Sequence, residues 1–196
     1  MIAIVNYGAG NLQSAKKAFD HLGSDVIVTG QPEAIAGADK IVFPGVGHFS
    51  SLSTLDRNGL RAALLDSASS GKPLLGICLG MQWLFEGSEE SVDTAGASLF
   101  PGKCQRFPST VKSPHVGWNS LRVKENSRLL RGIVQDSFVY YTHSFYAPIV
   151  AETTACTEYE TQFSGAVERD NLFGVQFHPE KSGDVGLQIL KNFCEL

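Results

Sequence analysis

The segment GICLG, residues 76 to 80, places the thiol of Cys78 between two glycines. This G-x-C-x-G spacing matches the nucleophile elbow, usually written G-x-S-x-G, in which a strand turns sharply into a helix and strains the middle residue. The glycines let the two backbones pass close together, and the first N–H groups of the helix favour the thiolate, the form that attacks. The alternative is a small cysteine packed into a tight turn, because free cysteines are often core residues.

A cysteine nucleophile needs a base, and the base needs an orienting group. The segment FHPE, residues 177 to 180, supplies candidates for both. His178 precedes a proline, which favours extended backbone, and residues i and i+2 of an extended segment share a side. The Glu180 carboxylate therefore lies near the His178 ring, where it favours the imidazolium and orients it. Alone, this pair would indicate a capping or core histidine and a solvated loop charge, but with Cys78 it indicates a catalytic triad.

The segment FPGVG, residues 43 to 47, ends an apolar run. A Gly-x-Gly turn there exposes backbone N–H groups that can stabilise an oxyanion, each contributing about 3–4 kcal/mol. The alternative is an ordinary turn that needs a positive φ. The earlier Gly8-Ala9-Gly10 turn lacks the third glycine of a dinucleotide-binding motif, so we reject that interpretation.

The remaining histidines are weaker candidates. His21 falls on a predicted helix, and His48 and His115 fall in predicted loops, so we expect all three at the surface. His143, in YYTHSFY, ends a predicted strand and is a candidate to line the site.

Composition limits the class of protein. The chain has 196 residues, 43% apolar and 18% charged, with a formal net charge of −4. No cluster of Lys and Arg suggests nucleic acid or an acidic membrane, and no apolar run suggests a signal peptide or a membrane span. The cysteines lie far apart, which argues against zinc and disulfides and favours the cytoplasm; they are Cys78, Cys104, Cys156 and Cys194.

These candidate residues need an α/β scaffold. Apolar runs at 2–5, 25–29, 40–43 and 73–77 alternate with helical patterns after Asn11, over about 49–70 with a break at Asn58-Gly59, and from the elbow to Phe85. This alternation predicts a parallel sheet with helices on both faces.

The second half of the chain is read differently. Residues 87–120 are rich in Gly, Ser and Pro, and we expect loop with short strands. Turn-separated strand patterns follow at 120–123, 137–143, 147–156, 163–170 and 172–178, and an amphipathic helix at 182–193. This half is predicted to be antiparallel or mixed, and residues 1–196 are predicted to form one domain.

With these motifs, the sequence resembles the class I glutamine amidotransferases, and within them the glutaminase subunits of imidazole glycerol phosphate synthase from histidine biosynthesis. The resemblance is carried by NYGAGNL, FPGVGHF, GICLGMQWLF, PHVGWNSL, YYTHSFY and FHPEKSG. It implies a flavodoxin-like open sheet and no cofactor or metal. Asn6 and Trp83 depart from the common pattern, and neither belongs to the predicted triad.

The resemblance also implies a mechanism. Cys78 attacks the side-chain amide of glutamine, His178 protonates the departing ammonia, and Glu180 orients His178. The N–H groups of Leu79 and of the segment Gly45, Val46 and Gly47 would hold the oxyanion. The resemblance assigns glutamine binding to Gly45, Gln82, Ser144 and Phe145.

A partner is implied as well. In the family, ammonia passes to a cyclase subunit with a (β/α)₈ barrel, in a 1:1 heterodimer, and this chain is too short to hold such a barrel itself. The resemblance places four residues at the interface or channel mouth: Asn11, Trp118, Tyr140 and Lys181. Their alternatives are core aromatics and a solvated charge.

Three other functions stay open. One is a glutaminase subunit of another ammonia-channelling synthase, such as vitamin B6 synthase. Another is a flavodoxin-like hydrolase or chaperone with an elbow cysteine, and the last is a catalytically silent binding subunit. Titration with a glutamine-mimicking electrophile discriminates, because only a competent glutaminase should be labelled at Cys78.

Overall fold

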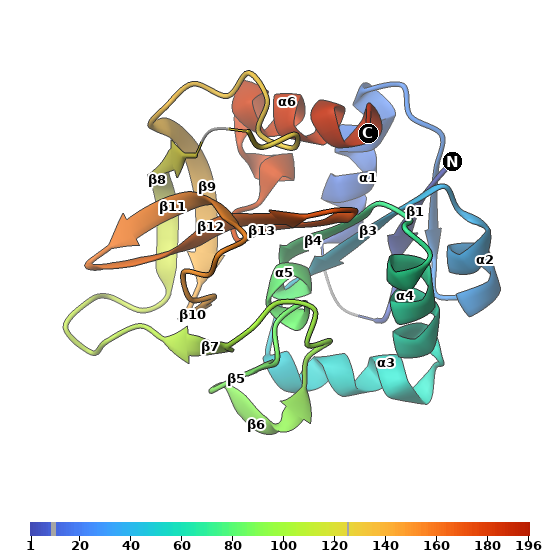
Figure 1. Ribbon diagram of the computed structural model, residues 1–196, viewed down its shortest axis with the longest axis horizontal. Coiled ribbons are helices and arrows are strands. Elements are labelled where there is room, and N and C mark those ends of the chain that lie inside the picture. The colour runs from blue at the N-terminus through green and yellow to red at the C-terminus, as the bar shows by residue number, and fades with distance from the viewer. Residues whose placement is uncertain (9–10, 125) are drawn as a thin grey trace.

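The computed structural model describes residues 1–8, 11–124 and 126–196 (Figure 1). Ala9 and Gly10, from the glycine-rich turn considered above, lie outside this range. The helices are α1 (Leu12–His21), α2 (Pro32–Gly37), α3 (Thr54–Arg57), α4 (Leu60–Ser69), α5 (Leu79–Trp83) and α6 (Gly183–Cys194), with 3₁₀ helices η1 (Phe49–Ser53) and η2 (Pro179–Lys181). The strands are β1 (Ile2–Val5), β2 (Val26–Thr29), β3 (Lys40–Gly45), β4 (Leu74–Cys78), β5 (Gly87–Ser88), β6 (Ser91–Ala95), β7 (Lys103–Arg106), β8 (His115–Val123), β9 (Ser137–His143), β10 (Phe145–Tyr146), β11 (Thr153–Tyr159), β12 (Thr161–Arg169) and β13 (Leu172–Val175).

The main sheet holds nine strands within the described residues, in the order β2-β1-β3-β4-β13-β12-β11-β8-β9. The first five of these pair in parallel, and the pairs from β13 onward are antiparallel. In Figure 1, α1 and α6 lie on one side of the sheet and α2 to α5 on the other. The predicted open α/β sheet, with a parallel core and helices on both faces, is confirmed.

The core has two layers, one on each face of the sheet. Strand β1 shows why its sequence is apolar throughout: Ile2 and Ile4 pack with α1 and α6, whereas Ala3 and Val5 pack with the helices of the other face. Strands of a parallel sheet are buried on both faces, so their sequences lose the alternation of a half-exposed strand.

The short strands expected within residues 87–120 are present as β5, β6 and β7. The predicted starts of two later strands were wrong. Strand β8 begins at His115 rather than at residue 120, because continuous pairing with β9 from His115↔His143 to Leu121↔Ser137 overrides the low strand propensity of Gly117. Strand β11 begins at Thr153, six residues after the predicted start at 147. Reciprocal hydrogen bonds between Val150 and Thr153 close a turn there instead.

A second, smaller sheet lies beside the first, in the order β10-β7-β5-β6 within the described residues. Its strands come from the segment between α5 and β8 and from β10, directly after β9. This sheet sits below the main sheet in Figure 1, beside α5. It therefore adds a wall next to the helix that follows Cys78.

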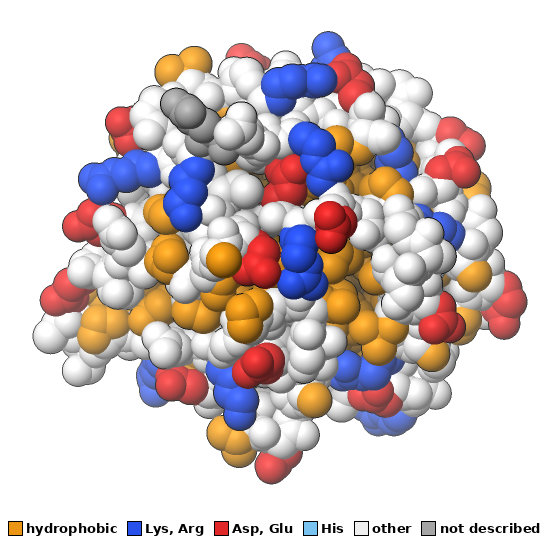
Figure 2. All heavy atoms as spheres, viewed as in Figure 1, with side chains coloured by type: hydrophobic (Ala, Val, Ile, Leu, Met, Phe, Trp, Pro, Cys, Tyr) orange, Lys and Arg blue, Asp and Glu red, His pale blue; other side chains and the backbone are white. Residues whose placement is uncertain are grey.

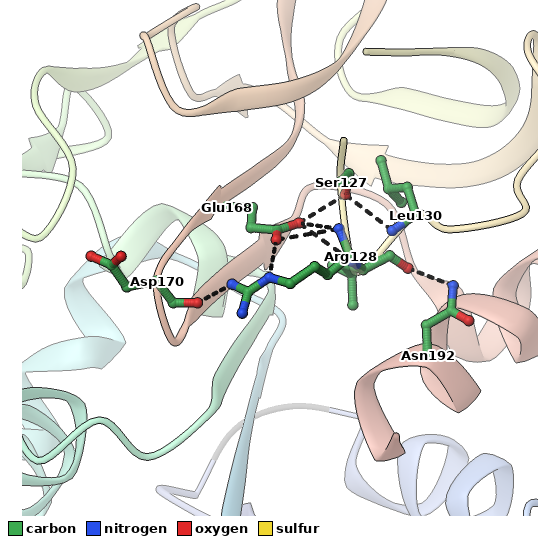
Figure 3. Close-up of polar contacts among 7 residues, drawn as sticks. Ser127, Arg128, Leu130, Glu168, Asp170 and Asn192 are labelled. Atoms are coloured by element: carbon green, nitrogen blue, oxygen red, sulfur yellow. Dashed lines mark hydrogen bonds and ion pairs between the residues drawn. The ribbon is translucent and has the colours of Figure 1, made fainter. Parts of the chain in front are cut away.

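The loop after β8 is held by one buried carboxylate (Figure 3). Glu168 of β12 accepts hydrogen bonds from the Ser127 hydroxyl at 2.8 Å and from Nε of Arg128 at 2.7 Å, and Arg128 also donates to the Asp170 carbonyl. Asn192 of α6 donates to the carbonyl oxygens of Leu129 and Arg131. These contacts anchor the loop to both the sheet and the last helix.

The surface in view carries basic and acidic side chains interspersed rather than gathered by sign (Figure 2). Among the described residues, no helix has both the length and the apolar character to cross a membrane.

Candidate active site

Cys78 ends β4, caps α5, and has φ 55° and ψ −109°. A non-glycine residue in such a conformation carries about 1–3 kcal/mol of strain, which the surrounding structure must hold in place. The flanking glycines do so: a Cβ on Gly80 would lie 1.8 Å from the Phe43 carbonyl oxygen, and one on Gly76 would lie 2.6 Å from that of Gly80. The predicted elbow geometry is confirmed, and the thiol's role as nucleophile stays a prediction.

The thiol opens into a cavity of about 220 Å³. This cavity lies at the carboxyl ends of β3 and β4, where open α/β sheets bind their ligands. Its described lining residues are Val46, Gly47, Cys78, Leu79, Gln82, Glu90, Pro114, Thr142, His143, Ser144 and Phe145. A cavity of this size suits a small molecule, and one wall comes from the smaller sheet.

His178 and Glu180 form a buried pair, with Nδ1 of His178 2.8 Å from Oε1 of Glu180 and side-chain exposures of 2% and 3%. One detail of the prediction was wrong. His178 is extended, but Glu180 lies in η2, so the pair meets across the first turn of a 3₁₀ helix rather than along a strand. The other ring nitrogen, Nε2, is buried and has no hydrogen-bond partner in the described chain.

The charge of His178 follows from its neighbours. Burial lowers the pKa of His178, but the Cys78 sulfur and the Glu180 carboxylate outweigh this effect and raise it to about 10. His178 is therefore an imidazolium at neutral pH and can give a proton to a leaving group.

The predicted oxyanion donors lie in the same cavity as the thiol. Val46, Gly47 and Leu79 line the cavity with Cys78, and Gly47 has a φ of +110°, which favours glycine. Gly45 has a packing reason to be glycine, because a Cβ there would lie 2.8 Å from both Cβ of Leu79 and the Tyr7 hydroxyl. Its part in binding glutamine stays a prediction.

Three of the four predicted glutamine-binding residues, Gln82, Ser144 and Phe145, line the cavity together. The buried Gln82 donates from Nε2 to the Phe145 carbonyl at 2.8 Å, and Ser144 and Phe145 line the cavity. Glu90, the one acidic side chain among the described lining residues, was not predicted from the sequence. The Phe49 N–H donates to its Oε2 at 2.7 Å. No motif marked it, because it lies in a turn between two short strands.

The predictions for three of the four other histidines are confirmed, and one is wrong. His143 lines the cavity as expected, and His21 and His48 are exposed. The prediction for His115 was wrong, because it is 4% exposed and stacks on Tyr141 and Tyr159 within the sheet. Burial lowers the pKa of His143 to about 3 and that of His115 to about 4, so both rings are neutral at pH 7.

Three of the four predicted interface residues lie together. The rings of Trp118 and Tyr140 are 6.1 Å apart on paired strands, and Nζ of Lys181 lies 5.8 Å from the Tyr140 ring centre. Trp118 is 55% exposed, which excludes the core alternative for it. Asn11 caps α1, a helix that packs beside η2.

Curated relatives match the chain along its whole length. It is 48% identical to imidazole glycerol phosphate synthase subunit HisH of Moorella thermoacetica, over 100% of this chain and 94% of the relative. It is 46% identical to the protein of the same name from Methanothermobacter thermautotrophicus, over 100% and 98%.

Solved structures agree on the fold. A structure of PurLQS from Thermotoga maritima superposes with a TM-score of 0.78 at 19% identity, over 99% of this chain and 97% of that one. A crystal structure of a glutamine amidotransferase gives 0.77 at 16% identity, over 98% of each chain. The family model described as glutamine amidotransferase class-I matches residues 3–196. With an elbow cysteine, a buried His-Glu pair and a match of this extent, the chain belongs to the class I glutamine amidotransferase family.

Proposed function

We propose that this chain is the glutaminase subunit of an imidazole glycerol phosphate synthase and that residues 1–196 form a single amidotransferase domain. It hydrolyses L-glutamine to L-glutamate and ammonia for use in histidine biosynthesis. The observation that carries this proposal is the strained Cys78 thiol at the wall of a small cavity, beside the buried ion pair of His178 and Glu180. A thiol that only filled space would not need a backbone conformation of this cost.

The chemistry runs in two steps. The Cys78 sulfur bonds to the side-chain carbonyl carbon of glutamine, and the C–N bond breaks as His178 gives its proton to the departing nitrogen. A γ-glutamyl thioester and ammonia result. His178 then takes a proton from water, whose oxygen attacks the thioester, and glutamate leaves as the sulfur is restored. Glu180 keeps the imidazole oriented throughout.

Charge develops on the carbonyl oxygen in both steps. We assign the stabilisation of this oxygen to the N–H of Leu79 and an N–H of the segment from Gly45 to Gly47, because Leu79, Val46 and Gly47 line the cavity and Gly45 pairs with Cys78. The α-carbon of glutamine carries a carboxylate and an ammonium group, and each of them needs a partner of complementary charge in the site. Backbone groups around Ser144 and Phe145 are assigned to its carboxylate, and the Glu90 carboxylate to its ammonium group.

Ammonia must reach a second active site before it is protonated. We assign that site to a cyclase subunit with a (β/α)₈ barrel, in a 1:1 cytoplasmic heterodimer that makes imidazole glycerol phosphate and an aminoimidazole carboxamide ribonucleotide. The exposed Trp118, with Tyr140 and Lys181, supports a docking surface on this side of the chain. The names of the relatives support the pathway.

Glutamate release from glutamine tests this proposal. We would assay the chain alone, then with a cyclase and its nucleotide ligand, using Cys78→Ala as the control. Strong stimulation by the cyclase that the control lacks is the expected result. Activity that ignores the cyclase would keep the glutaminase and reject the partner. An inactive chain under every condition would reject both.

A further inference from the structure

The side chain of Gln176 contacts the Cys78 sulfur directly. Gln176 follows β13, is fully buried, and places Nε2 3.7 Å from the sulfur. It stands two positions before His178, in the short segment between β13 and η2. The strand end that delivers the base therefore also delivers a carboxamide to the nucleophile.

The contacts of this carboxamide determine which end faces the sulfur. The Phe145 carbonyl can only accept, so the Gln82 group 2.8 Å from it must be the NH₂. The second hydrogen of the same NH₂ is directed at Oε1 of Gln176, at 3.1 Å. With its oxygen used in this way, Gln176 must present its own NH₂ to Cys78.

The Phe145 carbonyl, where this series of hydrogen bonds begins, also accepts a hydrogen bond from His143. Nδ1 of His143 is 2.9 Å from the same Phe145 carbonyl and must donate to it, so Nε2 of His143 accepts from Nδ1 of His115 at 3.1 Å. The acceptor oxygen of Phe145 thus receives two buried donors. Neither can reverse without leaving a buried polar group unpaired, which costs about 1–3 kcal/mol.

The sulfur has partners of two kinds. As a thiol it can donate to the Thr142 carbonyl, 3.9 Å away, but as a thiolate it has no hydrogen to give, and that contact is lost. The Gln176 contact behaves in the opposite way, because a donor binds a charged acceptor more strongly than a neutral one. Gln176 therefore favours the form of Cys78 that attacks.

We propose that Gln176 is a further catalytic residue, which donates a hydrogen bond to the Cys78 sulfur and stabilises its anionic form before attack and after thioester hydrolysis. The proposal rests on the proposed glutaminase function for its biological meaning. Its test uses alkylation of Cys78, which needs no glutamine, so the two can fail independently.

The experiment measures the rate at which iodoacetamide alkylates Cys78 in the full chain as a function of pH. Gln176→Met keeps the length of the side chain and removes the donor. It should raise the pH of half-maximal alkylation by about one to two units, since a hydrogen bond to a charged group is worth roughly ten- to a hundredfold. Gln176→Glu replaces the NH₂ by an oxygen and should raise that pH further. Gln188→Met, on α6, should leave it unchanged.

Turnover gives a second readout. The value of kcat for glutamine should fall by about ten- to a hundredfold in Gln176→Met, on the same basis. A folded Gln176→Met chain with unchanged alkylation and unchanged kcat would overturn the proposal. If neither variant folds, the unmutated ¹⁵N-labelled chain decides. The side-chain NH₂ signals of Gln176 should follow the pH titration of Cys78 and lose that response after alkylation, whereas signals that ignore pH would reject the contact.

Discussion

Two buried histidines near Cys78 differ in charge at neutral pH. His178 has a carboxylate and a sulfur beside it, which raise its pKa to about 10 despite burial. His143 has no carboxylate partner among its hydrogen bonds, so burial lowers its pKa to about 3. When the surroundings of two neighbouring groups move their pKa values apart in this way, the two groups are suited to different roles. On the proposed function His178 transfers the proton, and His143 donates a hydrogen bond to the Phe145 carbonyl.

The lowered pKa values predict acid sensitivity. His143 and His115 titrate below the ordinary value of about 6.5, so the unfolded chain binds protons that the folded chain refuses. Their contribution to the free energy of unfolding is complete above pH 6.5 and is lost as the pH falls towards 4 and 3. Urea unfolding of the chain between pH 7 and 4.5 should show a decline of up to about 1.4 kcal/mol per pH unit for each histidine.

The variants for this test are matched in chemistry. His143→Gln should flatten the decline, because its side chain does not titrate, although the chain will be less stable at pH 7. His21→Gln changes an exposed histidine and should leave the slope as it is. Equal slopes in all three chains would contradict the assignment.

Glu90 gives a prediction about binding. Glu90→Gln removes the negative charge assigned to the ammonium group of glutamine, so KM should rise by about ten- to a hundredfold with a smaller change in kcat. Steady-state glutamate release measures both. Glu89→Gln alters the neighbouring carboxylate, which accepts from the Arg106 N–H instead of lining the cavity, and should keep the KM of the unmutated chain.

Among single residues, those that could be predicted from the sequence are marked by their immediate neighbours in the chain. Cys78 lies between glycines and His178 precedes a proline, so both could be recognised from spacing alone. Glu90, His115 and Gln176 could not, because their roles depend on which strands pair. Gln176 did carry a signal, its position two residues before His178, but only the location of Cys78 gives that spacing a meaning.

At the scale of elements, η2 positions the Glu180 carboxylate, and α6 holds η2 at contact distance. A Cβ on Gly186 of α6 would lie 1.9 Å from the Pro179 carbonyl oxygen. The helix can approach this closely only with glycine at that point. The geometry of the His-Glu pair is therefore set partly by a residue on a different helix.

Gly186→Ala should separate α6 from η2. Overpacking of this kind costs about 1–3 kcal/mol, so thermal unfolding should shift downward and glutamate release should fall with it. Gly37→Ala is the control, because a Cβ at Gly37 meets open space and its φ is ordinary. Full activity and stability in Gly186→Ala would show that η2 does not depend on this contact.

Periodicity was a good guide to these elements in the parallel half and a poorer one elsewhere. Runs such as β1 and β4 are apolar throughout because both faces are buried. Residues 115 to 119 of β8 were not predicted as strand, because Gly117 and Asn119 lower the strand propensity there. Pairing with β9 stabilises the strand despite this low propensity.

For the whole molecule, the most informative surface is on the hairpin β8–β9, at the end of the main sheet. Val116, Trp118 and Phe138 are between 55% and 60% exposed there. Apolar side chains gathered on one exposed face indicate a docking surface. On the proposed function, the cyclase covers it.

Trp118→Ala should weaken binding of the cyclase by at least about thirtyfold, as expected for an aromatic residue at the centre of an interface. Calorimetric titration measures the change. The melting temperature of the isolated chain should stay the same, because the ring is largely exposed. Val92→Ala removes another exposed apolar side chain, on β6, and should leave the affinity unaltered. Equal affinities for the two variants would move the interface elsewhere.

The hairpin is hydrogen-bonded to His178 and to Ser182, directly after η2. The His178 N–H donates to the Tyr140 carbonyl at 2.9 Å, and the Tyr140 N–H donates to the Ser182 hydroxyl, also at 2.9 Å. The amide hydrogen of His178 can exchange with deuterium only when this junction opens. Its exchange rate in the free chain therefore measures how often the base leaves its place, and a partner that clamps Tyr140 should slow it.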